Sequence, residues 1–224
     1  MSIVAIPFAV DIDKVKSVFG CKDRALLESV KTARLYKNYA NQSEEFPIPR
    51  YQYDFDEALE DIFFHYVKLE DRKPRTGFLR IVRSKTDSGL NKDIAHGYGY
   101  ALLVICDYLG IQLLPTGDGF NYGADFQTAV AIMKEKGLQL DLNDMFEQHE
   151  VFDIPPIDDF PAITLYGKKE ITHINVIMEK VEIDESKTDI EKEGFDEVQE
   201  ILKFIRDSFR TCEEKGLEMI TFAH

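Results

Sequence analysis

The feature that most constrains this chain is an apolar run from Tyr98 to Leu109, in which Asp107 carries the single charge. A segment this apolar has to be covered by protein on nearly every side. We therefore predict a buried central helix, with Gly97 and Gly99 allowing close approach of a neighbouring backbone. The run leads into a glycine-rich segment, residues 115–123.

The segments around this run have strand-like and helix-like patterns. β-Branched and aromatic residues predict strands over 3–10, 163–166 and 217–222. Helical spacing and capping residues predict helices over 12–19, 22–35, 54–69, 125–136 and 195–215. Residues 170–183 fit both periodicities equally well. We predict one α+β domain over residues 1–224, with several helices packed on a small, mostly antiparallel sheet that includes the N- and C-terminal strands.

The chain is acidic, with a formal net charge of −14 from 41 Asp and Glu against 27 Lys and Arg. This balance argues against binding to nucleic acid or to an anionic membrane, because both require a clustered basic surface. Two interpretations stay open, namely general solubility and an acidic face that docks a basic protein partner. Residues 70–92 form the basic segment of the chain, for which we expect pairing with the acidic surface.

The cysteines Cys21, Cys106 and Cys212 are far apart in the sequence and form no CxxC pair. They therefore support neither a zinc knuckle nor a dithiol redox site. We predict that Cys106 is buried inside the apolar run. Free thiols fit a reducing compartment, the N-terminus lacks the basic region of a secretory signal, and the run falls short of the roughly 20 residues that span a bilayer. A cytoplasmic location is the resulting expectation.

Three pieces of the sequence resemble an uncharacterised family of soluble bacterial proteins, a domain of unknown function. They are the opening Phe8–Val15 with Gly20–Asp23, the central GYGYAL of Gly97–Leu102, and the ending Glu214–His224. The chain departs from the family pattern at Leu103, where an acidic residue is usual, at Cys21, where serine is common, and in the long basic segment 70–92. The resemblance implies one α+β domain with paired terminal strands, and it favours a helix over 170–183. It implies no catalytic residue.

The motifs that carry chemistry do not assemble into a known catalytic pattern. The glycine-rich segment lacks the Lys and Ser/Thr of a phosphate-binding loop, so we expect a structural turn there. The histidines show no HExxH, HxH or HxxxH spacing, so no metal and no cofactor are predicted. There is no GxSxG elbow either.

These observations favour a non-enzymatic, cytoplasmic protein-binding module, such as an immunity-like or toxin-neutralising partner. This hypothesis predicts an acidic face flanked by exposed aromatic residues, namely Tyr36, Tyr39, Tyr51 and Tyr53. The alternative is a small-molecule enzyme with a site at the glycine-rich loop 115–123, where His96, Asp118 and Tyr122 would converge as acid–base groups. A regulatory homodimer is a third interpretation that the sequence does not separate from the first.

Overall fold

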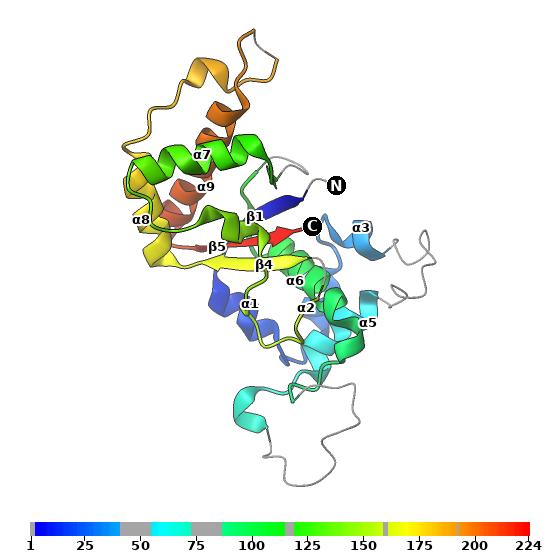
Figure 1. Ribbon diagram of the computed structural model, residues 1–224. Helices are drawn as coiled ribbons and strands as arrows, with labels where there is room; N and C mark the ends of the chain where they lie inside the picture. Colours follow the sequence, from blue (N-terminus) through cyan, green and yellow to red (C-terminus); the bar gives the residue numbers. More distant parts are fainter. Residues whose placement is uncertain (1–2, 41–54, 73–86, 115–118, 159–160, 192) are drawn as a thin grey trace. The chain divides into compact units, whose positions relative to one another are not determined.

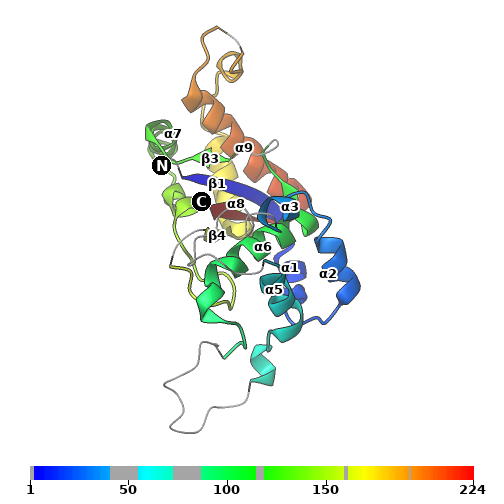
Figure 2. The ribbon, with the colours of Figure 1, turned by 90° about the vertical axis from the view of Figure 1, so that its right-hand side faces the viewer.

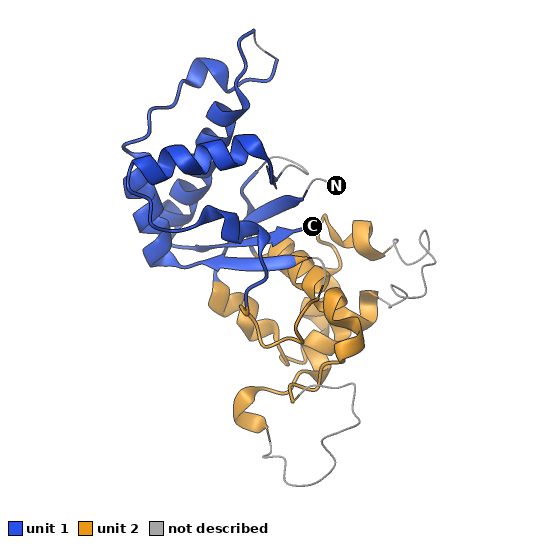
Figure 3. Ribbon diagram, in the orientation of Figure 1, with its two compact units in different colours: residues 1–11, 110–149, 162–224 blue, residues 12–109, 150–161 orange. Residues whose placement is uncertain are grey.

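The computed structural model describes residues 3–40, 55–72, 87–114, 119–158, 161–191 and 193–224 (Figure 1). The chain divides into two compact units (Figure 3). The first, here called the sheet unit, comprises residues 1–11, 110–149 and 162–224, and the second, the helical unit, comprises 12–109 and 150–161. Each unit is built from segments that are distant in the sequence, and the prediction of one domain over 1–224 stays a prediction.

The sheet unit contains a five-stranded antiparallel sheet with the strand order β2-β1-β5-β4, and β3 also pairs with β1. Its strands are β1 (Val4–Val10), β2 (Ile111–Gln112), β3 (Phe120–Asn121), β4 (Ala162–Tyr166) and β5 (Glu218–Ala223). The terminal strands β1 and β5 lie side by side, with Ala5 opposite Ala223 and Val10 opposite Glu218. The predicted α+β class and the pairing of the terminal strands are thus confirmed.

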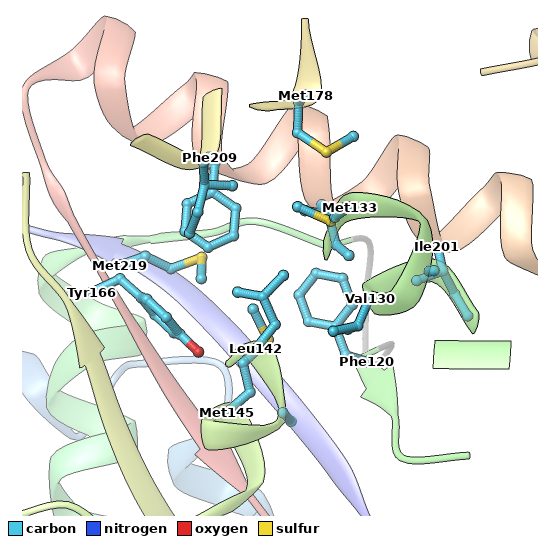
Figure 4. Close-up of a cluster of buried hydrophobic side chains, with 14 of the residues drawn as sticks. Phe120, Val130, Met133, Leu142, Met145, Tyr166, Met178, Ile201, Phe209 and Met219 are labelled. Atoms are coloured by element: carbon cyan, nitrogen blue, oxygen red, sulfur yellow. The ribbon is translucent and has the colours of Figure 1, made fainter. Parts of the chain in front are cut away.

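One face of this sheet is covered by α7 (Ala124–Glu135), α8 (Lys168–Met178), α9 (Glu197–Lys215) and the short 3-10 helix η4 (Leu142–Phe146) (Figure 1, Figure 2). Figure 4 shows the resulting core, in which Met219 and Tyr166 of the sheet meet Phe209 of α9 and Met133 of α7. Tyr166 and Phe209 are in edge-to-face contact, with ring centroids 5.5 Å apart. Each large side chain buried here stabilises the fold by about 1.5–3 kcal/mol relative to an exposed position.

The helix at 168–178 settles the ambiguity of residues 170–183. It buries Ile171, Ile174 and Ile177, whereas Val176 is 45% exposed. An alternating strand would have placed Val176 on the same face as Ile174, so the helical period is the one that matches the burial. The Glu170 carboxylate accepts a hydrogen bond from the Gly167 amide (2.6 Å) and so caps the start of this helix.

The last helix, α9, ends where its sequence predicts and begins two residues later than predicted, after Asp196. The Asp196 carboxylate accepts hydrogen bonds from the amides of Val198 (3.0 Å) and Gln199 (3.4 Å). Gly216 ends the helix in the left-handed region, with φ of 66°, where a residue without Cβ is favoured.

The helical unit contains α1 (Ile12–Val18), α2 (Arg24–Val30), α3 (Tyr36–Ala40), α5 (Phe55–Glu60), the π-helix η1 (Asp61–His65), the 3-10 helices η2 (Leu69–Asp71) and η3 (Lys92–Ile94), and α6 (Ala95–Leu109). The apolar run forms α6, which contacts α1, α2 and α5, so the predicted central helix is confirmed. Its single charge is buried: the Asp107 carboxylate accepts from the Leu35 amide (2.8 Å) and pairs with Arg34 (3.5 Å).

Two details of the helical unit differ from the prediction. At Gly99 the close neighbours are side chains rather than backbone, because a Cβ there would lie 2.8 Å from Pro161 Cδ and 2.9 Å from Ile157 Cδ1. The helix predicted over 54–69 ends at His65. Its last carbonyls, of Ile62 and Phe63, accept from the amides of Gly20 (2.8 Å) and Lys22 (2.9 Å), and these tertiary bonds replace the next helical turn.

No helix within the described ranges has the length and apolar character needed to cross a membrane.

Candidate functional site

The residues predicted to form an enzyme site belong to different parts of the structure. His96 lies in α6 of the helical unit, and Tyr122 follows β3 in the sheet unit. Asp118 lies outside the described residues. The convergence of these three side chains therefore stays a prediction. Tyr122 is 43% exposed, packs edge-to-face on Phe146 and accepts a hydrogen bond from Gln127 Nε2 (3.2 Å).

The aromatic residues predicted to be exposed are engaged with their neighbours where the structure describes them. Tyr36 is half-buried and donates a hydrogen bond to Asp56 Oδ1 (2.7 Å). Tyr39 is also half-buried and packs against Tyr100, with ring centroids 4.8 Å apart. Burial raises the pKa of the Tyr39 phenol. Tyr51 and Tyr53 lie outside the described residues.

The helical unit instead carries an open groove of about 480 Å³, here called the aromatic groove. Phe19, Tyr66 and Phe152 form its aromatic wall. The Phe19 and Phe152 rings are stacked at 5.6 Å with an interplanar angle of 10°, and the Tyr66 ring contacts Phe19 edge-on at 5.0 Å. Leu69 also lines the groove and is 74% exposed. An apolar side chain this exposed beside an aromatic pocket is typical of binding surfaces.

The end of the π-helix positions Tyr66 against Phe19. The Tyr66 amide donates to the Asp61 carbonyl (2.9 Å), and the chain then turns into an extended conformation at Tyr66. Gly20, with φ of 65°, lies so close to this turn that a Cβ would be 2.8 Å from the Tyr66 carbonyl oxygen. Only a glycine fits here without a shift of backbone. Irregular helix ends of this kind occur often at functional sites.

A polar triad fixes one side of the groove. Asp153 forms an ion pair with Arg72 and accepts a hydrogen bond from the Tyr66 hydroxyl (2.9 Å). The Arg72 guanidinium also lies 5.7 Å from the centre of the Tyr66 ring, within the range of a cation–π contact. Burial raises the pKa of the Tyr66 phenol although Arg72 opposes this shift, so the phenol stays a neutral donor to Asp153.

The groove also has two lysines at its rim. Lys16 and Lys68 are exposed, and neither forms an ion pair with any residue in the described ranges. The charge of Asp153 is already compensated by Arg72. With Glu70 as the remaining carboxylate, the groove has a local excess of positive charge on a chain whose net charge is −14.

A second polar arrangement lies in the same unit, on the π-helix itself. The Asp61 carboxyl group is buried and accepts a hydrogen bond from the Tyr98 hydroxyl (2.6 Å), while His65 Nδ1 lies 2.6 Å from its other oxygen. The Tyr98 hydroxyl in turn accepts from the Asn91 amide (2.9 Å). The His65 side chain is 60% exposed, so the far side of its ring faces solvent. A buried carboxyl group that orients an imidazole is a recurring element of acid–base sites.

The part of the chain that the structure describes contains one group of potential metal ligands. Asp144, Glu147 and His149 of the sheet unit have donor atoms within 4.8 Å of one another. The thiols show no such grouping: Cys106 is fully buried, as predicted, and burial raises its pKa, which makes it a poor nucleophile.

The aromatic groove could not be predicted from the sequence, because its walls come from three separate segments, around Phe19, Tyr66 and Phe152. Each of these residues alone fits a core position in its own segment. One signal was present: the sequence after His65 keeps aromatic and aliphatic residues, Tyr66, Val67 and Leu69, next to charged ones. The prediction of a helix over 54–69 places Tyr66 and Val67 on its apolar, core-facing side instead.

Comparison with known proteins supplies a family but no activity. No curated protein and no solved structure matches this chain. The sequence profile of one family matches residues 1–224, which is the whole chain. The chain belongs to the family described as a domain of unknown function, DUF7691.

Proposed function

We propose that this chain is a protein-binding module whose docking site is the aromatic groove. The observation that carries the proposal is the combination of an aromatic wall, the exposed Leu69, and two lysines, Lys16 and Lys68, that form no ion pair within the described ranges. Aromatic pockets rimmed by polar residues supply most of the binding energy at protein interfaces. A volume of about 480 Å³ suits one large side chain with its flanking backbone rather than a folded domain.

The charges of the groove favour an acidic peptide segment as the occupant. Asp153 is compensated by Arg72, whereas Lys16 and Lys68 have no carboxylate partner among the described residues. A segment with an aromatic or branched aliphatic anchor next to Asp or Glu would satisfy both features. The basic partner predicted from the net charge remains a proposal for the rest of the surface. Neutralisation of a toxin in the bacterial cytoplasm is the particular use of such a module that we propose.

The test is selection from a random-peptide library displayed on phage, followed by anisotropy titration of a selected, labelled peptide. We expect the selected peptides to combine an aromatic or aliphatic anchor with acidic residues. Phe152→Ala should weaken binding about tenfold or more, because it removes half of the stacked pair. Leu69→Asp should also weaken it, whereas Ile190→Asp is the matched control, since Ile190 is 72% exposed in the sheet unit.

Charge is tested separately with Lys16→Glu and Lys68→Glu, and Lys169→Glu serves as the control at an exposed site of α8. Loss of affinity in the first two variants, and weaker binding of the wild type at high salt, would support an acidic occupant. If the selected peptides were basic, or if they bound the Phe152→Ala variant as tightly as the wild type, the groove would not be the docking site proposed here.

A proton-transfer enzyme is the second candidate, and the Asp61–His65 pair favours it. A carboxyl group that holds one imidazole nitrogen leaves the other nitrogen free to exchange a proton with a substrate. Hydrolysis of p-nitrophenyl acetate tests this reactivity. An enzymatic role requires the wild type to be faster than His65→Gln and Asp61→Asn, with His173→Gln in α8 as the control. Equal rates in all four proteins would argue against it.

A further inference from the structure

A cluster of three donor residues lies in the sheet unit, in and after the short helix η4. Asp144, Glu147 and His149 follow one another at spacings of three and two residues, and their donor atoms lie within 4.8 Å of one another. The sequence predicts no metal, because the histidines lack a chelating spacing among themselves. The cluster instead combines one imidazole with two carboxylates, a set that histidine spacing does not reveal.

The backbone that carries these residues is fixed to strand β4, which lies at the end of the sheet order. The His149 amide donates to the Ile163 carbonyl (3.0 Å). The Thr164 hydroxyl lies 2.6 Å from the Asp144 carbonyl oxygen and 2.9 Å from that of Glu147, and it can donate its proton to either. The backbone of all three donor residues is therefore hydrogen-bonded to β4, which fixes their positions as a pre-organised ligand site requires.

Within the described part of the chain, the three donor side chains are not engaged in ion pairs or hydrogen bonds with other residues. Elsewhere, comparable carboxylates are paired, as Asp153 is with Arg72 and Asp56 with Lys31. Two carboxylates held near each other without a cation repel, and a bound cation would remove this repulsion.

An independent observation comes from Tyr166, whose side chain belongs to strand β4. This residue is 5% exposed, yet its hydroxyl has no hydrogen-bond partner among the described residues, which is unusual for a buried tyrosine. Figure 4 shows the hydroxyl directed toward Leu142 and Met145, the part of η4 that also carries Asp144. Burial, and then the negative charge of Asp144, raise the pKa of the phenol, so the hydroxyl keeps its proton.

We propose that Asp144, Glu147 and His149 bind one divalent transition-metal ion of the zinc type through two carboxylate oxygens and one imidazole nitrogen. The imidazole favours zinc or a neighbouring transition metal over Mg²⁺ and Ca²⁺, which prefer oxygen ligands alone. Three protein ligands leave a coordination position for water, as in catalytic rather than structural zinc sites.

Only the side chains have to adjust for this binding. Donor atoms around a tetrahedral zinc ion, with bonds of about 2.0–2.1 Å, lie about 3.4 Å apart. The Glu147 and His149 side chains are exposed and can rotate to close the remaining distance, while Asp144 is half-buried. The backbone bonds to Ile163 and Thr164 would be unchanged.

The test is isothermal titration calorimetry, in which the metal-free, full-length chain is titrated with zinc chloride and, separately, with magnesium chloride. We expect one zinc ion per chain. His149→Gln, Glu147→Gln and Asp144→Asn should each weaken binding about tenfold or more, whereas Glu150→Gln, an exposed carboxylate next in the sequence, should not. Circular dichroism of each variant shows whether it folds like the wild type.

Tyr166→Phe is a further comparison: Tyr166 is not one of the proposed ligands, so its substitution should weaken zinc binding less than substitution of Asp144, Glu147 or His149 does. The proposal is overturned if the wild type binds no zinc or if magnesium binds equally well. It is also overturned if the triple variant, which combines Asp144→Asn, Glu147→Gln and His149→Gln, binds zinc as tightly as the wild type. Equal binding of magnesium would indicate simple screening of two carboxylates. The outcome is independent of peptide binding at the aromatic groove, which lies in the other unit.

Discussion

Two groups of acidic side chains, one in each unit, differ in whether the fold provides them with partners. In the helical unit, the carboxyl groups of Asp61 and Asp153 are each held by two neighbouring side chains, Tyr98 and His65 in one case and Arg72 and Tyr66 in the other. In the sheet unit, Asp144 and Glu147 lie together with no such partner in the described part of the chain. Acids of the first kind are needed to build the structure, whereas those of the second kind remain available to a ligand.

The largest effect is expected where a paired acid is buried. Asp61→Ala should lower the free energy of unfolding by about 3 kcal/mol, because it removes two short hydrogen bonds and leaves the buried Tyr98 hydroxyl without its acceptor. Asp61→Asn keeps an acceptor oxygen and should cost less. Urea denaturation of both variants measures the difference. A loss below about 1 kcal/mol for Asp61→Ala would mean that pairing does not distinguish this acid from Asp144.

For Asp144 and Glu147, we expect bound metal to change the stability of the native chain. If they bind zinc, free zinc at a hundred times its dissociation constant should stabilise the native chain by about 2.7 kcal/mol. A chelator should reverse this gain, and the variant lacking all three donors, Asp144, Glu147 and His149, should show neither change. Thermal or urea unfolding with and without zinc provides the measurement. Equal stabilisation of the triple variant would place any bound zinc elsewhere.

A paired acid near the surface should have an intermediate effect. Asp153→Ala should lower the free energy of unfolding by about 1–2 kcal/mol, because it leaves Arg72 and the Tyr66 hydroxyl without their partner. Asp153 is half-exposed, so water replaces part of what is lost. The same variant should also weaken peptide binding at the aromatic groove. Unfolding and anisotropy titration are compared with those of Glu150→Ala, which should match the wild type in both.

The smallest effect is expected when the unpaired acids are neutralised. Asp144→Asn combined with Glu147→Gln should leave the stability of the metal-free chain within about 0.5 kcal/mol of the wild type, or raise it, since the change removes only repulsion. Measurement at low salt gives the clearest result because screening is weak there. A marked destabilisation would show that these carboxylates do have a structural role. The contrast with the paired acids Asp61 and Asp153 would then be lost.

Much of the fold could be predicted because its signals are local. Gly216 marks the end of α9, and the apolar run predicts the buried α6, since a terminating glycine or an apolar stretch acts through its own neighbours. The strands β2 and β3 were missed because two residues are too short to show alternation. The helix predicted to Leu69 was too long, because the amides of Gly20 and Lys22, distant in sequence, take its last carbonyls.

The α+β class, the buried central helix and the acidic character of the chain all follow from the amino-acid sequence, and the family resemblance adds the pairing of the terminal strands. Which charges are neutralised and which are left for a ligand depends on the tertiary fold. The reason is physical: Asp153 and Arg72 are far apart in the chain and adjacent in space, so their pairing depends on contacts that no local pattern encodes. The same holds for the stacking of Phe19 on Phe152, which creates the aromatic groove.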